Sequence, residues 1–523
     1  MRKVCFVLLL LLATCFLHAQ KHDYNWFSRD RTTSPGTGIH VQYIDSIQDI
    51  DIQLFDWHGR VNASPAFSDK NGEFLFFSNN FHVYDSIGSV IENGDSIAIG
   101  FYQNYVLNNF PPDYALAIFQ NGGTIPISDS VFYMFHQTQE YWSGAPNWPI
   151  VGIEEQGDPL IIASDALHLT TVRKRTDGSL YIRPEEKEVL LLKDTIVESQ
   201  LTFVKHANGR DWWLLVPEHY SDSAYLFRIY PETGEIDMQG QTYFSDQNDR
   251  VTSIKVTRSS PDGTKLARLI NNYGSGIDHK LELFNFDRCT GAVERYFLDS
   301  LSPAEIWNLD GDLAFSENGR FLYMAASEYI FQFDMELDDP FSEFDTIAIA
   351  DDFRYLGVLP TAFGQFWEVP NGKLLVISAN STPFFHYIHQ PNEKGDACGF
   401  EMRAIVLPAE RLRPQDSVII KGLPTYPPYR MPPLDYDCET SVEEPERQSD
   451  VFLSLYPNPA WAETTVQIHG AEIGQARVLD INGRQVAERK GHGRFDVSTL
   501  PSGVYLVEVE TDCGVFVRKL VIR

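Results

Sequence analysis

The chain has 523 residues and carries 72 Asp and Glu against 42 Lys and Arg, which gives a formal net charge of −30 at pH 7. A surface this acidic repels phosphate backbones and anionic headgroups, so the composition excludes nucleic acid and anionic membrane surfaces as partners. Solubility outside a cell explains the charge most simply, and recognition of a cationic ligand is the alternative.

The chain begins with a predicted secretory signal peptide over residues 1–19. Arg2 and Lys3 precede an apolar run, Val4–Leu17, and cleavage after Ala19 fits the small residue there. No later stretch is long and apolar enough to cross a bilayer, so we expect no transmembrane segment. Export through the periplasm would place the remaining cysteines in an oxidising compartment.

Hairpins of one type recur along the middle of the chain. Each has an apolar strand, an Asn-Gly, Asp-Gly or closely related turn that favours positive φ, and a second strand dense in apolar residues. The last four turns are 54, 56 and 53 residues apart, and the turn glycines are Gly72, Gly209, Gly263, Gly319 and Gly372. A steady period of this size with four short strands per unit is typical of β-propeller blades.

We therefore predict an all-β fold with a propeller over residues 20–438. The interval between Gly72 and Gly209 has room for one or two diverged blades, around Val131–His136 and Leu167–Val172. This count favours seven blades, with six as the alternative.

The strands that follow the turns are apolar on both faces, as expected for sheets covered on both sides by neighbouring blades. Trp212 and Trp213 are adjacent in one such strand and must point to opposite faces. We expect both rings in the core between blades.

After the propeller the composition changes, and Pro and acidic residues replace aliphatic ones between Tyr426 and Asp450. Such a segment can bury little, so we predict a linker over residues 439–450. Residues 451–523 read as a small β-sandwich of the immunoglobulin type, with expected strands over 452–456, 464–469, 475–480, 484–488, 504–509 and 515–522.

This last module resembles the type A C-terminal sorting domain of the type IX secretion system, also known as the Por secretion tail. The resemblance rests on LYPNPA from Leu455, LDINGR from Leu479, LPSGVYLV from Leu500 and the closing KLVI. It implies export to the outer cell surface or medium, with the secretion machinery as partner. The residues that carry the implied signal are Tyr456, Pro457, Asn458, Pro459, Asp480, Gly483, Gly503, Tyr505 and Lys519.

The upstream region resembles secreted propellers of the WD40-like and lactonase-like kind. The resemblance rests on VKHANGRDWW from Val204, FDRCTG from Phe286 and LPTYPPYR from Leu423. It implies a fold but no activity.

Few residues outside the tail suggest chemistry. His206, Arg210 and Asp211 flank one turn and could line a binding face, although such a trio more often holds its hairpin together. The sequence contains no catalytic, metal or cofactor motif. Calcium remains an alternative, but the segment Asp69–Glu73 does not support it, because this segment lacks the spaced acidic residues of a calcium-binding loop.

Two kinds of covalent modification are also predicted. Cys398 and Cys438 are our choice for a disulfide that closes the Pro-rich segment onto the last blade, with other pairings open. A recurring tripeptide resembles an O-glycosylation acceptor of exported proteins: Asp, then Ser or Thr, then an aliphatic residue. The alternative explanation for this tripeptide is that Asp-Ser turns precede strands. The acceptors would be Ser46, Ser86, Ser96, Ser130, Thr195, Ser223, Ser300, Thr346 and Ser417.

Two functions remain open from the sequence. The first is a secreted or cell-surface propeller that binds a protein or glycan without catalysis. The second is a polysaccharide-acting hydrolase or lyase with its site at the propeller channel. Carboxylates that converge about 5 to 10 Å apart at the channel mouth would favour the hydrolase.

Overall fold

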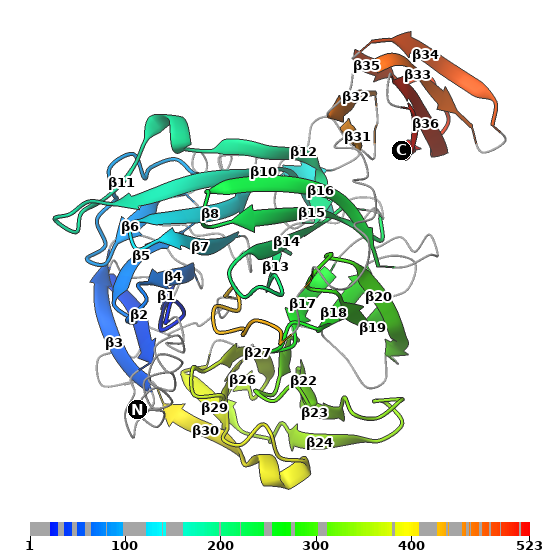
Figure 1. The fold of residues 1–523 in the computed structure, drawn as a ribbon. Helices are drawn as coiled ribbons and strands as arrows, with labels where there is room; N and C mark the ends of the chain where they lie inside the picture. The colour runs from blue at the N-terminus through cyan, green and yellow to red at the C-terminus, as the bar shows by residue number, and fades with distance from the viewer. Residues whose placement is uncertain are drawn as a thin grey trace, which may run out of the picture.

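The computed structural model consists almost entirely of antiparallel β-strands (Figure 1). It describes residues 21–29, 36–43, 50–57, 64–79, 81–97, 122–138, 140–142, 161–197, 200–219, 221–244, 254–272, 278–301, 311–378, 382–406, 426–435, 438, 452–456, 460, 462–469, 473–480, 483–491, 493–511 and 514–522. The predicted signal peptide, linker, Ser46, Ser417 and Pro457 to Pro459 lie outside these residues.

A ring of sheets forms the larger part of the molecule, and its first sheet supplies two blades. The strand order is β3-β2-β1-β4-β5-β6, and the two antiparallel halves pair at Trp26–Pro65 and Phe27–Ser64. The strands are β1 (Asn25–Arg29), β2 (Gly36–Tyr43), β3 (Ile50–Trp57), β4 (Ser64–Ser68), β5 (Phe74–Ser78) and β6 (Val83–Asp85).

The third blade is built around one long strand, β10, which pairs with β8 and β9 on one side and with β11 and β12 on the other. Its strands are β7 (Gly122–Ser128), β8 (Val131–Gln137), β9 (Glu140–Trp142), β10 (Ile161–Lys174), β11 (Leu180–Ile182) and β12 (Val189–Val197), with a 3-10 turn at Pro184–Glu186. Both segments in which we expected diverged blades therefore lie in one sheet.

The remaining four blades each contain four antiparallel strands in sequence order. The fourth has β13 (Thr202–Lys205), β14 (Trp212–Pro217), β15 (Ser223–Tyr230) and β16 (Glu235–Tyr243), and the fifth has β17 (Ile254–Ser259), β18 (Lys265–Asn272), β19 (Asp278–Phe286) and β20 (Val293–Leu301). The sixth has β21 (Leu313–Phe315), β22 (Phe321–Ala326), β23 (Tyr329–Asp334) and β24 (Phe344–Ile349). A short hairpin of β25 (Arg354–Tyr355) and β26 (Leu359–Pro360) precedes the seventh blade. The seventh blade has β27 (Phe363–Glu368), β28 (Leu374–Ser378), β29 (Phe384–Ile388) and β30 (Phe400–Val406), with a 3-10 turn at Gly395–Cys398.

Counted over the described strands, the ring has seven blades, so the propeller prediction is confirmed. The blade that the sequence periodicity missed is the N-terminal one, β1 to β3, because its turn carries no Asn-Gly or Asp-Gly pair. All five predicted turn glycines have positive φ, between 69° and 89°. Strands β14, β22 and β28 are buried along their whole length, as expected for sheets covered on both faces.

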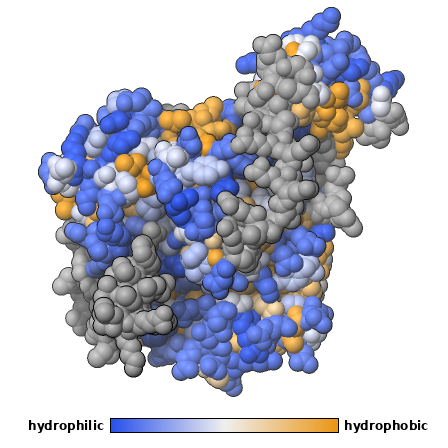
Figure 2. Space-filling view, viewed as in Figure 1, coloured by the Kyte–Doolittle hydropathy of each residue, from blue (hydrophilic) through white to orange (hydrophobic). Residues whose placement is uncertain are grey.

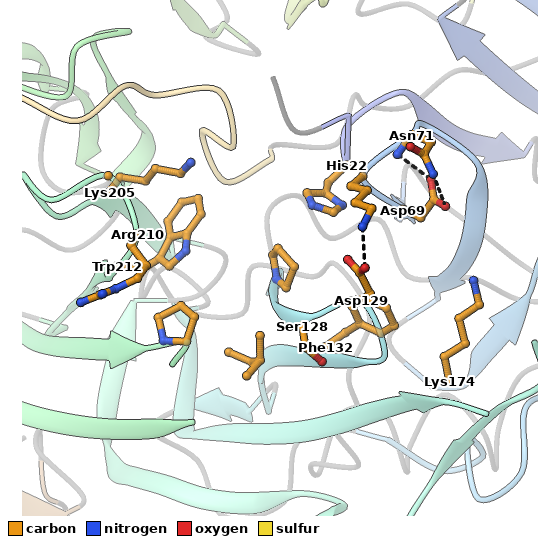
Figure 3. A pocket seen from close by; sticks show the side chains of 15 residues that line it. His22, Asp69, Asn71, Ser128, Asp129, Phe132, Lys174, Lys205, Arg210 and Trp212 are labelled. Atoms are coloured by element: carbon orange, nitrogen blue, oxygen red, sulfur yellow. Dashed lines mark hydrogen bonds and ion pairs between the residues drawn. The ribbon is translucent and has the colours of Figure 1, made fainter. Parts of the chain in front are cut away.

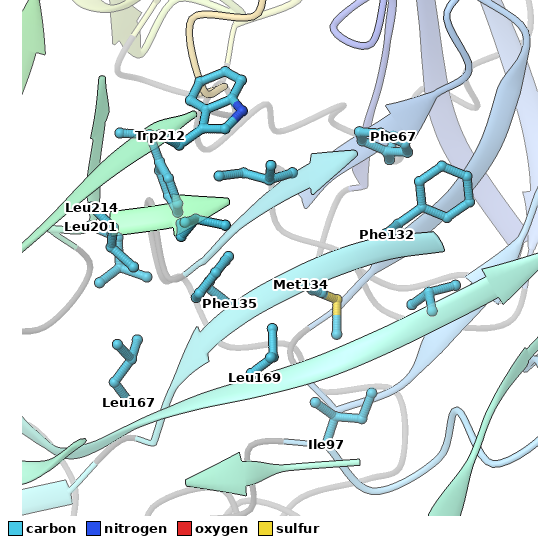
Figure 4. Close-up of a cluster of buried hydrophobic side chains, with 14 of the residues drawn as sticks. Phe67, Ile97, Phe132, Met134, Phe135, Leu167, Leu169, Leu201, Trp212 and Leu214 are labelled. Atoms are coloured by element: carbon cyan, nitrogen blue, oxygen red, sulfur yellow. The ribbon is translucent and has the colours of Figure 1, made fainter. Parts of the chain in front are cut away.

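Trp212 and Trp213 are each 2% exposed and lie in different hydrophobic clusters (Figure 4 shows the cluster of Trp212). Trp212 packs in the cluster with Phe132 and Phe135 of β8, and Trp213 in the one with Leu266 and Phe284 of the fifth blade. The two rings thus bind the fourth blade to both of its neighbours, which confirms their predicted place in the interblade core.

The first and last blades close the ring through apolar packing. Val41 and Tyr43 of β2 lie in one cluster with Trp367, Leu375 and Phe385 of the seventh blade. No strand of the seventh blade pairs with the first among the described residues, so side chains hold this junction.

The segment 426–435 lies inside the ring (Figure 1), and we call it the crossing segment. The Tyr426 hydroxyl donates to the Asn25 carbonyl at 2.5 Å, and the Tyr429 hydroxyl donates to the Thr124 carbonyl at 2.5 Å. Arg430 forms an ion pair with buried Asp23 at 2.8 Å. The segment therefore links blades that are distant in sequence.

The crossing segment also explains the disulfide, for which the sequence prediction was wrong. Cys438 pairs with Cys289, not with Cys398. Cys289 lies in the β19–β20 turn, where the buried Arg288 guanidinium donates to the Pro432 carbonyl at 2.8 Å and so holds the crossing segment beside this turn. Cys398 is a buried free thiol in the last blade, and burial raises its pKa.

The C-terminal unit is a β-sandwich of two sheets, as predicted. One sheet has β31 (Phe452–Tyr456), β32 (Glu463–His469) and β35 (Gly493–Asp496), and the other has β34 (Gln485–Lys490), β33 (Ile473–Leu479), β36 (Gly503–Thr511) and β37 (Gly514–Ile522). All six expected strands are present, and β35 was not predicted because it is short and flanked by Gly and polar residues.

Candidate functional site

A pocket of about 580 Å³ opens where turns of the second, third and fourth blades meet (Figure 3). A pocket of this size can hold a small ligand. The β4–β5, β7–β8 and β13–β14 turns arrive together because each joins the first two strands of its blade, and these turns lie at the same end of the ring. The lining residues are His22, Asp69, Lys70, Asn71, Pro126, Ile127, Ser128, Asp129, Phe132, Lys174, Lys205, Gly209, Arg210, Trp212 and Pro231.

The lining is rich in cations although the chain as a whole is acidic. Four Lys or Arg residues, Lys70, Lys174, Lys205 and Arg210, stand against two carboxylates, Asp69 and Asp129. This local charge is opposite in sign to the net charge of −30, so the field inside the pocket favours anions.

Both carboxylates of the pocket are occupied by contacts within the protein. Asp129 pairs with the Lys70 ammonium at 2.5 Å (dashed in Figure 3). Asp69 accepts hydrogen bonds from the backbone N–H groups of Asn71 and Glu73 at 2.8 and 2.9 Å, which shapes the β4–β5 turn. Asp69 therefore shapes this turn.

Lys205, at the end of β13, is the buried cation of the pocket and is 7% exposed. Its ammonium donates to the Tyr429 carbonyl at 2.5 Å and lies 5.2 Å from the centroid of the Trp212 ring. Burial, with a further contribution from the positive charge of Arg288, lowers the pKa of Lys205 to about 8. The crossing segment thus supplies the acceptor for this charge.

His22 lines the pocket as a neutral, fixed ring. It stacks on Phe67 with 4.8 Å between centroids, and its Nδ1 lies 2.5 Å from the Ser68 carbonyl, to which it donates. Burial lowers the pKa of His22 to about 4 although this hydrogen bond opposes the shift. His22 is therefore uncharged at neutral pH and leaves the positive charge to the Lys and Arg residues.

Of the predicted trio, only Arg210 lines the pocket. Asp211 is 2% exposed and accepts from Asn208, Arg210 and Arg228 at 2.9 to 3.1 Å. Burial favours the neutral acid, but these hydrogen bonds outweigh it and hold the pKa of Asp211 below its ordinary value. His206 is also buried and accepts from the Asn208 N–H at 3.2 Å, so both residues support the hairpin that carries Arg210.

Sequence reasoning missed Lys205, Lys174 and His22 as lining residues. One signal was available for Lys205: a charged residue in a strand that is otherwise apolar on both faces needs an acceptor. Nothing in the sequence showed that Tyr429 would supply it from more than 200 positions away.

Among the described residues, no group of three or more His, Cys, Asp or Glu side chains is placed to hold a metal ion. Six glycosylation candidates have described side chains, and they differ in exposure. Ser86, Ser130 and Thr346 are exposed, whereas Thr195 and Ser223 are each 2% exposed and enclosed by the fold; Ser96 is half-buried.

Residues 454–523 match a family described as the secretion system C-terminal sorting domain. The C-terminal sandwich is a type IX secretion sorting domain. The chain is therefore exported to the cell surface or the extracellular space. No curated protein matches the chain.

Several predicted signal residues of the sorting domain lie at its turns. Asp480 accepts from the Arg484 N–H at 2.9 Å, and Gly483 has a φ of 77°, so the two residues form the turn between β33 and β34. The Tyr505 hydroxyl donates to the Pro501 carbonyl at 2.8 Å. Gly503 begins β36, Tyr456 ends β31, and Lys519 lies within β37.

Figure 2 shows a largely hydrophilic propeller surface and hydrophobic residues on the sorting domain, where Leu506, Val515 and Val517 are exposed. No helix among the described residues has the length and apolar character needed to span a membrane.

Three solved structures are similar to the chain at low identity. A protein from Lactobacillus plantarum is 13% identical, with a TM-score of 0.38 over 74% of this chain and 97% of its own. The periplasmic gluconolactonase of Pseudomonas aeruginosa is 12% identical, with a TM-score of 0.33 over 96% and 99%. TolB from Acinetobacter baumannii is 12% identical, with a TM-score of 0.26 over 63% and 61%.

Proposed function

We propose that the exported propeller binds a glycan that carries acidic groups, and that it does so without catalysis. The observation that supports this proposal is the concentration of Lys70, Lys174, Lys205 and Arg210 around one pocket in a chain of net charge −30. A carboxylate or sulfate of the glycan would gain charge-assisted hydrogen bonds there.

The environment of the cations supports binding of a ligand with an apolar face as well as negative groups. The Lys205 ammonium donates to the Tyr429 carbonyl of the crossing segment, and the buried rings of Trp212 and Phe132 also line the pocket. Arg210 is on an exposed turn, where its guanidinium also contacts Glu232 at 2.8 Å and can exchange this surface contact for a ligand.

The second candidate is a polysaccharide hydrolase or lyase, and one observation keeps it open: two carboxylates, Asp69 and Asp129, line the same pocket. A hydrolase of this kind needs one carboxyl group that is protonated and one that is free to act. Asp129 is paired with Lys70 and Asp69 shapes its turn, so both are engaged in ways that suit binding better than catalysis.

The test is a glycan array with neutral, uronate-containing and sulfated members, followed by affinity measurements on the best ligand. We expect acidic glycans to bind, and Lys174→Ala and Arg210→Ala to weaken binding about tenfold each. Lys394→Ala is the matched control, because Lys394 is an exposed lysine of the seventh blade outside the pocket. The proposal is contradicted if neutral glycans bind as tightly as acidic ones, or if Lys394→Ala weakens binding as much as the pocket variants do. Binding of protein ligands alone would indicate a protein-binding propeller instead.

A hydrolysis screen on the same polysaccharides separates the two candidates. We expect no new reducing ends or unsaturated products. Product formation that disappears in Asp69→Asn or Asp129→Asn would favour the hydrolase or lyase instead.

A further inference from the structure

The sorting domain places one buried arginine in the propeller. Arg518 projects from β37, an edge strand of its sheet, and its side chain is 10% exposed. One of its terminal nitrogens, Nη2, donates to the Glu218 carboxylate at 2.5 Å and to the Asp194 carboxylate at 3.1 Å. It also contacts the Tyr225 hydroxyl, and the guanidinium carbon lies 5.3 Å from the centroid of the Tyr225 ring.

Three partners of this guanidinium belong to the propeller, and we call them the guanidinium site: Asp194, Glu218 and Tyr225. The other terminal nitrogen, Nη1, donates to the Leu453 carbonyl of β31 within the sorting domain. Asp194 lies in β12, Glu218 directly follows β14, and Tyr225 lies in β15, so the site joins the third and fourth blades. Glu218 lies beyond the C-terminal end of β14 and Trp212 begins that strand, so the site is at the opposite end from the cation-rich pocket.

Contacts within the propeller hold each member of the site. One Asp194 oxygen accepts from the Thr195 N–H at 2.7 Å, and the other accepts from the Tyr225 hydroxyl. Glu218 accepts from the Ser223 hydroxyl at 2.9 Å. The bridge between Ile196 and Glu218 fixes the backbones of the two blades at this point. None of these contacts involves the sorting domain.

The chemistry of the site matches a guanidinium better than other cations. Both carboxylates accept from one terminal nitrogen of the guanidinium, and the Tyr225 ring lies beside its carbon. An aromatic face beside two carboxylates favours a flat, weakly hydrated cation. Both acids are buried, with Asp194 1% and Glu218 8% exposed, so an empty site would leave two desolvated carboxylates close together.

We propose that Asp194, Glu218 and Tyr225 form a binding site for the arginine side chain of a peptide ligand, and that Arg518 occupies this site in the full chain. The sorting domain and the ligand therefore compete for one position. Because Arg518 is presented by an edge strand, an arginine in an extended peptide is the ligand segment that fits best.

The test uses the full chain, in which Arg518→Ala empties the site while the sorting domain stays attached. Methylguanidine is the first probe and an extended peptide with a central arginine is the second, with binding measured by calorimetry. We expect Arg518→Ala to bind both probes at least tenfold more tightly than the wild type, because the wild type must release its own arginine first. Methylammonium at the same concentration tests for charge without the planar fork, and we expect it to bind several times more weakly.

Two further variants make the result specific to the site. Asp194→Asn and Glu218→Gln, each combined with Arg518→Ala, should lose most of the probe binding, and a thermal melt of each shows whether it is folded. Arg494→Ala is the matched control, because Arg494 forms an exposed ion pair with Glu463 within the sorting domain. The proposal is overturned if folded Arg518→Ala binds no better than wild type or Arg494→Ala, or if folded double variants bind as well as Arg518→Ala.

Discussion

The Lys205 ammonium donates to the Tyr429 carbonyl at 2.5 Å across 224 positions of the chain. This hydrogen bond joins the floor of the candidate pocket to the crossing segment, which itself is tied to the first, third and fifth blades. The pocket is therefore a property of the closed ring, and perturbing the crossing segment should affect both stability and binding.

The pH dependence of stability should reveal Lys205. An ordinary lysine has a pKa of about 10.4, whereas burial lowers that of Lys205 to about 8 in the folded chain. Between these values the unfolded chain binds the proton and the folded chain does not, so this residue makes the free energy of unfolding rise with pH from about 8 to about 10.4. Below pH 8 both states are protonated, and the cost of the buried charge is constant.

We expect this rise to be on the order of 3 kcal/mol and to be absent from Lys205→Met. Urea unfolding at several pH values measures this rise. Subtracting the free energy of unfolding of Lys205→Met from that of the wild type removes the contribution of the other titrating groups, which the two proteins share. Lys394→Met should follow the wild-type curve. A wild-type minus Lys205→Met difference that does not vary with pH would show that Lys205 titrates normally.

Breaking the disulfide should destabilise the propeller. The bond between Cys289 and Cys438 closes a loop of 149 residues, and removing such a link costs about 2–5 kcal/mol because the unfolded chain gains entropy. Guanidinium unfolding of Cys289→Ser with Cys438→Ser measures the loss. Reductant should shift the wild type to the same midpoint and leave the double variant unchanged; a shift in the double variant would point to another bond.

Gly209 should tolerate no side chain. Its φ is 70°, and a Cβ atom would lie 2.9 Å from the Cβ of Pro433 in the crossing segment. We expect Gly209→Ala to lower the free energy of unfolding by about 2 kcal/mol or more, from backbone strain and the displaced segment together. Gly357→Ala is the matched control, because Gly357 has a φ of 74° but no atom within 4 Å of the added methyl group. If urea titration shows that both variants lose the same free energy of unfolding, the crossing segment must move away from the added methyl group without an energetic penalty.

Each aromatic junction of the fourth blade should contribute to stability. Trp212 and Trp213 lie in separate clusters on opposite faces of the fourth blade, so replacing either by Ala should cost about 3–5 kcal/mol through the cavity left behind. Tyr243→Ala, at an exposed ring of the same blade, should change the free energy of unfolding by less than about 1 kcal/mol. Chemical denaturation followed by circular dichroism tests this, and a loss below 1 kcal/mol at either tryptophan would argue against tight packing at that junction.

Glycosylation should follow the exposure of the candidate side chains. Peptide mapping of the secreted chain should find sugar only at accessible candidates such as Ser86, Ser130 and Thr346, because the folded propeller encloses Thr195 and Ser223. An intact mass equal to that of the bare polypeptide would contradict the glycosylation hypothesis. Sugar on Thr195 or Ser223 would require modification before folding.

Local patterns in the sequence were enough to predict the blades and the sorting domain. Asn-Gly, Asp-Gly and related turns at a steady period predict blades, because the backbone at each glycine needs positive φ, and adjacent tryptophans in a doubly apolar strand must face two neighbouring sheets. The sorting domain was recognised for the same reason, since its motifs are contiguous segments.

Features that depend on closure of the ring could not be predicted from the sequence. Cys438 could be assigned to Cys289 only after the crossing segment was seen to pass the β19–β20 turn, and Lys205, Lys174 and Arg210 meet at one pocket only because three blades present their turns together. Arg518 likewise meets Asp194 only through the contact between two units. Contacts between residues hundreds of positions apart leave no periodic trace in the sequence, because they depend on the path of the whole chain and not on any local preference.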